Sequence, residues 1–565
     1  MKFTNLVNPE LDIDFKKEKY VELKDDNEKF KYILLLVCKK LGRVIPQVFD
    51  GVTDYIDILI PDNLLNDTGF ITKVIREVPE ENYSQVEIIG WLYQYYNQSE
   101  KDRVMSENRA YKSNEIAYVT QLFTPDWIVK YMVENSLGKF WIENIDEQNE
   151  IASSAIKKEW KFYINEQEKK EREKIQPKDI SFIDPCCGSG HILVYAFEVF
   201  YQIYLNAGYN KNVISEMILK HNLYGLDIDD RAGQLSILSV LLKAREYDKN
   251  IFNNDVIKEI KIMSIPESNN IEQSLLDYFI DEEEKDNVKY LIDNLYNAKT
   301  IGSLLKLGNR DYTSLESKLM EDNSIFGIDL RNKLFPLIKV ATILSKKYQI
   351  IVTNPPYLAY SSMDTNLKKY LDKYYVDSKK DLCTAFMEID LLENNGYYGM
   401  INQHSWMFIS SYEKLRKKII EDYQIISMLH LGTRAFEEIG GEVVQTTSFI
   451  FNKVKNSNLS KFIRLVNCND STSKMNETIN MIRNKKYYSV DCNIFKNIPG
   501  YTFDYWMKNN VLELFKNKKI RDYAKVITGM TTGNNNKFLK LWYEVDLRKV
   551  EFNNTFIFLL RRPSP

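Results

Sequence analysis

The run Asn354-Pro355-Pro356-Tyr357 follows an apolar segment and has the chemistry of a pocket for an exocyclic ring amine. Such an amine is a poor nucleophile because its lone pair is delocalised into the ring. The Asn354 side-chain oxygen and the Pro355 carbonyl can accept hydrogen bonds from both N–H groups, which pulls the nitrogen toward a tetrahedral shape. The prolines fix the loop, and Tyr357 offers a stacking face for a base that has been flipped out of a duplex. These four residues are therefore predicted to be catalytic, with a surface turn or a WW-type ligand as the alternative.

Two further runs have the pattern of a nucleoside-cofactor site. In Asp184-Pro185-Cys186-Cys187-Gly188-Ser189-Gly190 the glycines permit close backbone approach beyond a strand end, where open α/β sheets bind ligands. In Gly225-Leu226-Asp227-Ile228-Asp229 a strand ends in an acid that can accept hydrogen bonds from both ribose hydroxyls. The two runs lie farther apart than the ~20 residues of a dinucleotide-binding unit, and the GxGxxG pattern is absent, so NAD is disfavoured. The cofactor-binding residues predicted from these runs are Asp184, Pro185, Cys186, Gly188, Ser189, Gly190, Asp227 and Ile228.

The elements around these runs predict a parallel, doubly wound α/β sheet. Short apolar segments alternate with amphipathic helical ones, and a long helix is expected to begin at His191. Strands are expected over residues 179–185, 223–228, 348–357, 396–403 and 446–454. Residues 1–115 have apolar clusters at helical spacing, which predicts a helical N-terminal domain. The charged stretches 143–178 and 250–345 are interpreted as helical insertions.

Composition limits the class of protein without indicating its function. The chain has 76 basic and 79 acidic side chains, so any nucleic-acid surface must be a local patch. No apolar stretch reaches the ~18 residues of a membrane span, and the N-terminus lacks the apolar core of a signal peptide. Its six cysteines have no metal-binding spacing. We expect a cytoplasmic protein without a membrane partner and without a metal.

The order of the motifs resembles that of the gamma-class N6-adenine amino-methyltransferases: Phe123-Thr124-Pro125, then the glycine turn, then GLDID, then NPPY. More closely, the chain resembles the PglX family of adenine-specific DNA methyltransferases from BREX phage-defence systems. The segments that carry this resemblance are QLFTPDWIVKYMVENSLG (121–138), DPCCGSGHILVYAFEVF (184–200), GLDIDDRAGQLSILSVLLKAR (225–245), AKTIGSLL (298–305), VTNPPYL (352–358), KKDLCTAFMEI (379–389) and GGEVVQTTSFIF (440–451).

The resemblance implies a class I fold that binds S-adenosyl-L-methionine and methylates adenine N6 in double-stranded DNA without a covalent enzyme intermediate. It also implies that Phe123, Thr124 and Pro125 hold the methionine end of the cofactor and that Ser303 lies near its adenine. Residues 442–447 would lie where the family has a base-pocket loop. Other BREX proteins are the partners that it implies, in a role that marks host DNA against phage DNA.

The resemblance also divides the chain into expected domains. A methyltransferase domain is expected over residues 116–455, a helical spacer over 456–520, and the start of a target-recognition region over 521–565. Because family members are usually much longer, we expect a natural truncation, a separate chain that supplies the rest of that region, or a sequence that is one part of a longer protein. Two alternatives stay open. The chain is a weakly active DNA-binding or scaffolding subunit of a defence complex, or its target is an RNA base or a protein glutamine.

Several reactive side chains have plainer interpretations than catalysis. His191 is expected to be a structural or cofactor-shelf residue, because direct methyl displacement needs no metal and an aspartate or solvent can take the proton. Cys186 and Cys187 are expected to pack under the cofactor loop, since a cysteine nucleophile for cytosine-C5 methylation requires a different loop. The aromatic run 92–97 is interpreted as core or interface packing rather than base stacking. A nuclease pattern from Asp12 or Asp14 to residues 22–24 is disfavoured, because such triplets are frequent in charged sequences.

Overall fold

The computed structural model describes residues 17–49, 60–67, 69–79, 88–107, 109–120, 122–144, 156–165, 174–253, 255–436, 444–454, 459–515, 517–518, 520–524 and 542–544. Two compact units make up the chain, residues 1–506 and 507–565. Within the second unit, α22 (Asn509–Leu514) and α23 (Ile520–Tyr523) are helical. Asp12, Asp14 and Glu442 lie outside the described residues, as does most of the recognition region expected over 521–565.

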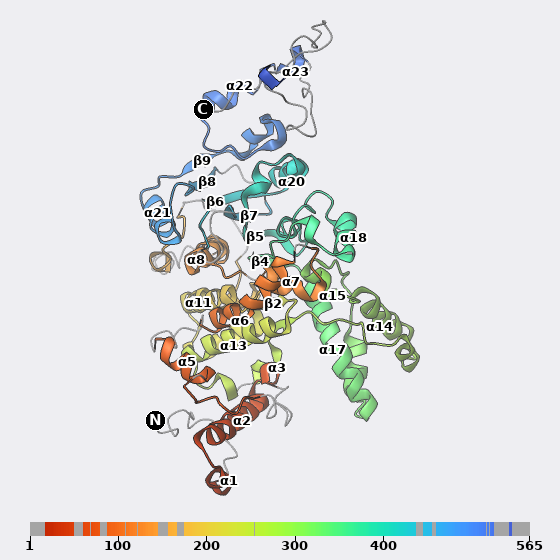
Figure 1. Cartoon of the computed structure of the whole chain (residues 1–565). Helices are drawn as coiled ribbons and strands as arrows, with labels where there is room; N and C mark the ends of the chain where they lie inside the picture. Colours follow the sequence, from red (N-terminus) through yellow and green to blue (C-terminus); the bar gives the residue numbers. More distant parts are fainter. Residues whose placement is uncertain are drawn as a thin grey trace. The chain divides into compact units, whose positions relative to one another are not determined.

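The first unit is built on one nine-stranded sheet in the order β3-β2-β1-β4-β5-β7-β6-β8-β9 (Figure 1). Strands β1 to β5 pair in parallel, β7 runs antiparallel to both β5 and β6, and β8 extends the sheet parallel to β6. The strand bounds are β1 (Phe182–Asp184), β2 (Leu223–Asp227), β3 (Lys261–Ser264), β4 (Tyr348–Thr353), β5 (Leu392–Gln403), β6 (Gln424–Gly432), β7 (Thr446–Asn452), β8 (Ser460–Arg464) and β9 (Tyr488–Val490).

The strand order reverses between β1 and β4, and this reversal fixes where a ligand can bind. From β1 the chain winds outward through β2 and β3, then returns to add β4 and β5 on the other side of β1. Phe182 and Ile183 of β1 lie opposite Ile350 and Ile351 of β4. Ligands of doubly wound sheets bind beyond the carboxyl ends of the strands at such a switch point. The fold is the doubly wound α/β fold of class I methyltransferases, so the expected fold class is confirmed.

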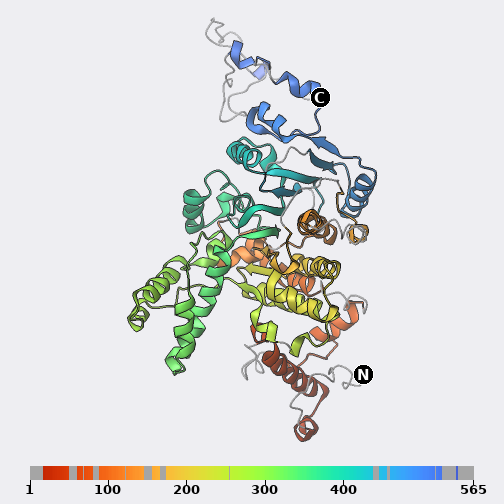
Figure 2. The ribbon, with the colours of Figure 1, turned by 180° about the vertical axis from the view of Figure 1, so that it is seen from behind.

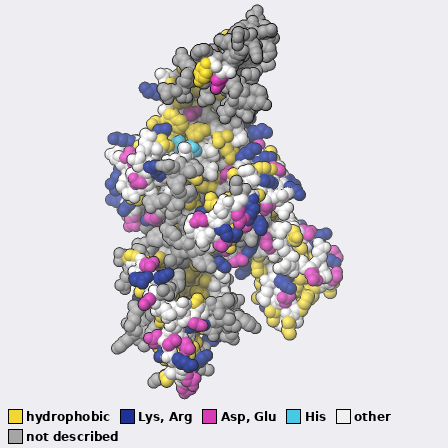
Figure 3. All heavy atoms as spheres, viewed as in Figure 1, with side chains coloured by type: hydrophobic (Ala, Val, Ile, Leu, Met, Phe, Trp, Pro, Cys, Tyr) yellow, Lys and Arg dark blue, Asp and Glu magenta, His cyan; other side chains and the backbone are white. Residues whose placement is uncertain are grey.

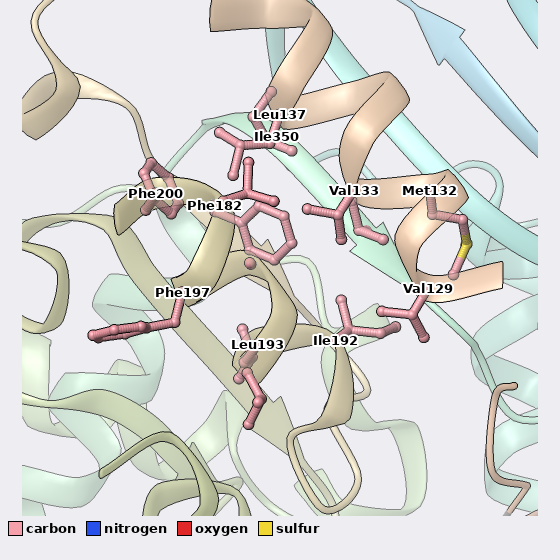
Figure 4. Packing of buried hydrophobic residues seen from close by; sticks show 14 of the residues in the cluster. Val129, Met132, Val133, Leu137, Phe182, Ile192, Leu193, Phe197, Phe200 and Ile350 are labelled. Atoms are coloured by element: carbon pink, nitrogen blue, oxygen red, sulfur yellow. The ribbon is translucent and has the colours of Figure 1, made fainter. Parts of the chain in front are cut away.

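Helices cover both faces of the sheet. One face packs on α8 (Asp126–Val133), α11 (His191–Asn206) and α13 (Asp230–Tyr247), whose buried side chains form one apolar cluster with alternate residues of the strands. Helices α11 and α13 lie side by side in both views (Figure 1, Figure 2). Figure 4 shows Phe182 of β1 between Val133 of α8 and Phe200 of α11.

The opposite face is covered by helices that precede β4 and β5 in sequence. The Tyr348 hydroxyl donates to the Ile343 carbonyl of α17 (Ile325–Ser345), and the Tyr398 hydroxyl donates to the Phe386 carbonyl of α19 (Leu382–Phe386). The other helices are α9 (Lys139–Asn144), α12 (Lys211–Met217), α14 (Glu282–Asn294), α15 (Ala298–Ile301), α16 (Thr313–Glu321), α18 (Thr365–Tyr374), α20 (Glu413–Asp422) and α21 (Ser471–Arg483), with a π-helical turn over Glu134–Gly138.

The N-terminal region is helical in its described parts, and it belongs to the same compact unit as the sheet. Its helices are α1 (Lys17–Glu22), α2 (Asp26–Val44), α3 (Pro46–Phe49), α5 (Phe70–Glu77), α6 (Ile88–Ser106) and α7 (Ser113–Thr120). Among the described residues, no helix combines the length and apolar character needed to cross a membrane.

Each of the five predicted strand segments contains a strand, and the predicted helix starts at His191. Two interpretations were too simple. The helical spacer expected over 456–520 contains β8 and β9, which continue the sheet. The insertion expected over 250–345 contains β3, the strand at the other end of the sheet order.

Candidate active site

A cavity opens at the switch point, with about 1090 Å³ of empty space when the solvent at its mouth is included. Five segments far apart in sequence meet there: the turn after β1, the end of β2, the segment around Ser303, the loop after β4 and the residues before α8. The predicted site residues that line it are Phe123, Thr124, Asp184, Pro185, Cys186, Gly188, Ser189, Asp227, Ile228, Ser303, Asn354 and Pro356. The structure therefore brings together most of the residues singled out from sequence.

The glycine turn and the acid at the end of β2 are held against each other. The Gly188 N–H donates to Asp227 Oδ2 at 2.9 Å, and the Asp229 N–H donates to Asp227 Oδ1 at 2.9 Å. Each oxygen keeps a second lone pair for a hydroxyl donor. Gly188 has a φ of +51°, and no heavy atom lies within 4 Å of the place that a Cβ would take, so its backbone faces open space. Burial raises the pKa of Asp227 to about 6.

Asp184 connects the cofactor turn to the end of β4. Its Oδ1 accepts from the Cys186 N–H at 3.0 Å and from the Thr353 hydroxyl at 2.8 Å. Its Oδ2 is buried and has no donor among the residues that the structure describes. Burial raises the pKa of this carboxyl to about 7, against the opposing effect of its two hydrogen bonds. A buried acceptor without a donor, on the wall of a cavity, is a candidate contact for a bound ligand.

Asn354 is fixed with its oxygen free. Its Nδ2 donates to the Leu122 carbonyl at 3.2 Å and to Thr124 Oγ1 at 3.0 Å. These two acceptors identify the nitrogen and leave Oδ1 on the other side of the amide. Asn354 Oδ1 is buried and accepts no hydrogen bond from any described residue. The arrangement provides one oriented acceptor for an incoming N–H donor.

The remaining residues of the NPPY run flank this acceptor. Pro355 is buried and Tyr357 is half-buried, and neither lines the cavity described above. The Tyr357 hydroxyl is buried with no hydrogen-bond partner in the described part of the chain, and burial raises its pKa. The loop is anchored where it ends, because Asp381 Oδ1 accepts from the N–H groups of Leu358 and Cys383, each at 3.1 Å.

Two residues that were predicted to bind the cofactor, Pro125 and Gly190, do not line the cavity. Pro125 lies directly before α8, at its N-cap position, and does not line the cavity. Gly190 has a φ of +88°, and a Cβ there would lie 2.6 Å from Ser236 Oγ, so glycine permits α11 to start close against α13. Ser303, by contrast, lies in the wall, where its hydroxyl donates to the Pro185 carbonyl at 2.5 Å. This bond joins the 299–303 segment to the glycine turn.

The sequence interpretation missed the contribution of the N-terminal helices. Gly90 and Tyr93 of α6 and residues 116, 117 and 120 of α7 line the same cavity. The Tyr93 hydroxyl donates to an Asp229 carboxylate oxygen. A Cβ on Gly90 would lie 2.5 Å from Ser189 Oγ, so α6 passes directly over the glycine turn. The signal was an isolated glycine inside an apolar helical pattern, which marks a close approach.

The surroundings of His191, Cys186 and Cys187 do not favour a role for these side chains as nucleophiles. The His191 ring lies 4.5 Å from the Phe123 ring, and both line the cavity. Cys186 and Cys187 lie in the turn itself, and burial together with Asp184 and Asp227 raises their pKa values well above the ordinary thiol value. A thiol in this state is a poor nucleophile. Of the 442–447 segment, Thr446 and Thr447 belong to β7 and are buried.

Comparison with known proteins finds adenine-specific methyltransferases similar to this chain. The family described as N-6 DNA Methylase matches residues 109–278, and the Eco57I restriction-modification methylase family matches residues 221–436. The adenine-specific methyltransferase PglX of Lacticaseibacillus casei (strain Zhang) is 35% identical over 559 residues, which cover 93% of this chain and 46% of that protein. The resemblance to the PglX family is confirmed.

A second PglX-like protein gives the same result. The adenine-specific methyltransferase BrxX of Escherichia coli O9:H4 (strain HS) is 34% identical over 585 residues, 95% of this chain and 47% of that protein. This chain spans about half the length of the curated PglX and BrxX relatives that it matches. Among solved structures, a cryo-EM structure of a DrdV–DNA complex matches 85% of this chain and 41% of that chain, with 10% identity and a TM-score of 0.44.

Proposed function

We propose that the chain transfers a methyl group from S-adenosyl-L-methionine to the N6 amino nitrogen of adenine in duplex DNA. The observation that supports this most strongly is the amide of Asn354. Its nitrogen is fixed by two acceptors, and its buried oxygen accepts no hydrogen bond from any described residue. An acceptor without a donor is costly to keep buried, and an exocyclic amine provides the missing N–H group.

The residues of the cavity fit the proposed cofactor. Asp227 would accept hydrogen bonds from the ribose hydroxyls, and the open space before Gly188 admits a ligand against the backbone. Phe123 and Thr124 would hold the methionine end, and Ser303 with Ile228 would border the adenine. When bound, S-adenosyl-L-methionine supplies an electrophilic methyl group.

The chain's own groups would prepare the amine. Asn354 Oδ1 and the Pro355 carbonyl would accept its two N–H hydrogens, which moves electron density back onto the nitrogen. Tyr357 would stack on the ring of an adenine that has left the duplex, since a paired base cannot reach such a loop. Transfer would be direct, and no cysteine would take part, because the thiols of Cys186 and Cys187 stay protonated.

The partners follow from the same proposal. Duplex DNA is the substrate, and other BREX proteins are candidate partners through the relationship to PglX and BrxX. Each of these is part of the proposal for the whole protein, since the matched relatives are about twice as long.

Tritiated methyl transfer to duplex DNA of mixed sequence tests the proposal. We expect incorporation by the wild-type protein and a loss of at least about a hundredfold in Asn354→Ala, because one oriented electrostatic contact to the reacting group accounts for about that much rate. Cofactor affinity of the variant should stay near the wild-type value. If the wild-type protein binds cofactor but incorporates no label, the result would favour the scaffolding alternative. Label in RNA or protein alone would favour the alternative in which the target is an RNA base or a protein glutamine.

A further inference from the structure

The segment that leaves the NPPY loop carries five lysines and three aspartates over residues 359–380, a local positive charge in a chain whose net charge is slightly negative. Residues 359–380 include Lys368, Lys369, Lys373, Lys379 and Lys380, interleaved with tyrosines. Most of this segment is α18 and the two loops that flank it. In Figure 3 several Lys and Arg side chains lie on the surface of this region, next to acidic ones. An interface with a polyanion must be a local patch in a protein with this net charge.

Three of these lysines gather around one tyrosine. The ammonium groups of Lys368, Lys379 and Lys380 lie 5.5, 5.9 and 6.0 Å from the centre of the Tyr360 ring. A tyrosine ring attracts each cation individually, but the cations repel one another. Cations that are held close together on the surface form a site of positive potential, which an anion would stabilise.

The carboxylates nearby do not neutralise this cluster. Asp372 accepts from the Tyr360 hydroxyl at 3.0 Å and pairs with Lys379 at 2.8 Å. Asp364 is the N-cap of α18, where it accepts from the N–H groups of residues 366 and 367. In the described part of the chain no ion pair reaches Lys368 or Lys380, and Lys368 donates only to the Ser361 carbonyl, at 3.2 Å. Among the described residues, the three ammonium groups therefore have one ion pair between them, that of Lys379 with Asp372.

The cluster is fixed to the loop that carries Asn354. The Tyr360 N–H donates to the Lys380 carbonyl at 3.0 Å, and Ala359 and Asp381 form an antiparallel bridge. The Leu382 N–H donates to the Leu358 carbonyl at 2.9 Å, and Asp381 accepts from the Leu358 N–H. Tyr360 follows Tyr357 by three residues along this anchored loop. An anion held by the three lysines would therefore lie beside the proposed base pocket.

We propose that Lys368, Lys379 and Lys380 around Tyr360 form a binding site for a backbone phosphate of duplex DNA, next to the adenine that enters the NPPY pocket. This inference rests on the proposed function, because that function brings DNA to this loop. A phosphate fits the cluster because lysine ammonium groups bind it as point charges. The site would hold the strand whose base has left the stack, and it carries no sequence information.

The test compares three double variants with the wild-type protein. Lys368→Gln/Lys380→Gln removes two charges and keeps the Lys379–Asp372 pair. Lys368→Arg/Lys380→Arg keeps both charges. Lys249→Gln/Lys258→Gln, the opposite-edge variant, removes the same charge from two exposed positions between α13 and β3. These positions precede β3 and so lie toward the amino ends of the strands, whereas the cavity lies at the carboxyl ends. A fluorescein-labelled duplex of mixed sequence is the DNA probe, and cofactor affinity is measured on the same samples.

We expect the Lys368→Gln/Lys380→Gln variant to bind the duplex about tenfold more weakly at low salt. Its plot of log affinity against log salt should be shallower by about 0.9 for each phosphate that the variant no longer neutralises. The arginine variant and the opposite-edge variant should bind like the wild type. Equal affinity and equal salt slope in the wild type and the first variant would overturn the inference, as would an equal weakening in the opposite-edge variant. The cofactor measurement separates the two proposals. A wild-type protein that does not bind S-adenosyl-L-methionine would count against the proposed function and not against the phosphate site.

Discussion

Asn354 Nδ2 donates to Thr124 Oγ1 at 3.0 Å, a hydrogen bond between residues 230 positions apart. Thr124 stands just before α8 on one side of the cavity, and Asn354 stands just after β4 on the other. The bond fixes which end of the amide faces the Leu122 and Thr124 oxygens, and so which end is left for a substrate. The FTP segment thus orients the NPPY segment, in addition to the cofactor contact that we propose for it.

Replacing Thr124 by valine tests this orientation. Thr124→Val keeps the size of the side chain and removes the acceptor for Asn354 Nδ2, which leaves the amide with the Leu122 carbonyl alone. We expect kcat/KM for DNA to fall about tenfold, the effect of one hydrogen bond worth about 1.4 kcal/mol. Thr124→Ser retains the hydroxyl and should stay near wild type. Steady-state methylation kinetics decide the matter, and equal activity of the valine and serine variants would contradict the role of this bond.

Asp227 is expected to carry much of the cofactor affinity. In Asp227→Asn the carboxylate becomes an amide, which loses charge-assisted acceptance and turns one oxygen into a donor that faces the Gly188 or Asp229 N–H group. We expect the dissociation constant for S-adenosyl-L-methionine to rise about tenfold or more, consistent with about 1.5–3 kcal/mol for a hydrogen bond to a charged group. Isothermal titration calorimetry measures this directly. Asp248→Asn, after the far end of α13, is the matched control, and an equal effect of both variants would reject the assignment.

Asp184 makes stability depend on pH in a defined direction. Burial raises its pKa from 3.8 to about 7, so between these values the folded protein holds a proton that the unfolded chain has released. Stability without cofactor must therefore decrease as pH rises through this window. Asp184→Asn is neutral throughout and lacks this contribution. The thermal midpoint of the variant minus that of the wild type should increase as pH rises from about 4 to about 7. A constant difference across this range would show that the carboxyl titrates normally.

Gly90 tests whether the N-terminal helices complete the cavity. Alanine normally stabilises a helix by about 1 kcal/mol relative to glycine, but a Cβ at position 90 would lie 2.5 Å from Ser189 Oγ and 3.2 Å from the Phe123 ring. We expect Gly90→Ala to weaken cofactor binding severalfold and to lower the thermal midpoint. Adding Ser189→Ala removes the nearest atom and should restore much of the stability. A variant as stable as wild type, with unchanged affinity, would mean that α6 adapts without cost.

Much of the candidate site could be predicted because its chemistry lies in short local runs. The turn at 184–190, the acid at 227 and the loop at 354–357 each follow a strand, and parallel strands bring their carboxyl ends to one edge. The contacts of Gly90 and Tyr93 could not be predicted in this way. They come from a helix that precedes the sheet by about a hundred residues, and helical periodicity does not say what a helix packs against.

Four strands were not predicted, and three of them share a physical reason. The fourth, β6 (Gln424–Gly432), is nine residues long, buried and inside the sheet, so this reason does not apply to it. Residues 261–264, 460–464 and 488–490 are short, and two of them lie at the ends of the sheet order, where polar side chains are tolerated. Their sequences therefore lack the apolar run that marked β1 and β4. The central strands are buried on both faces and carry a stronger signal.

In the proposed reaction, the amine that meets Asn354 is the N6 amine of adenine in DNA. The most direct measurement is nucleoside mass spectrometry of duplex DNA after incubation with the purified protein and isotopically labelled S-adenosyl-L-methionine. We predict label in N6-methyladenine and in no other nucleoside, and none with Asn354→Ala. Label in a methylated cytosine, or unlabelled DNA from a protein that binds both cofactor and duplex, would contradict the account.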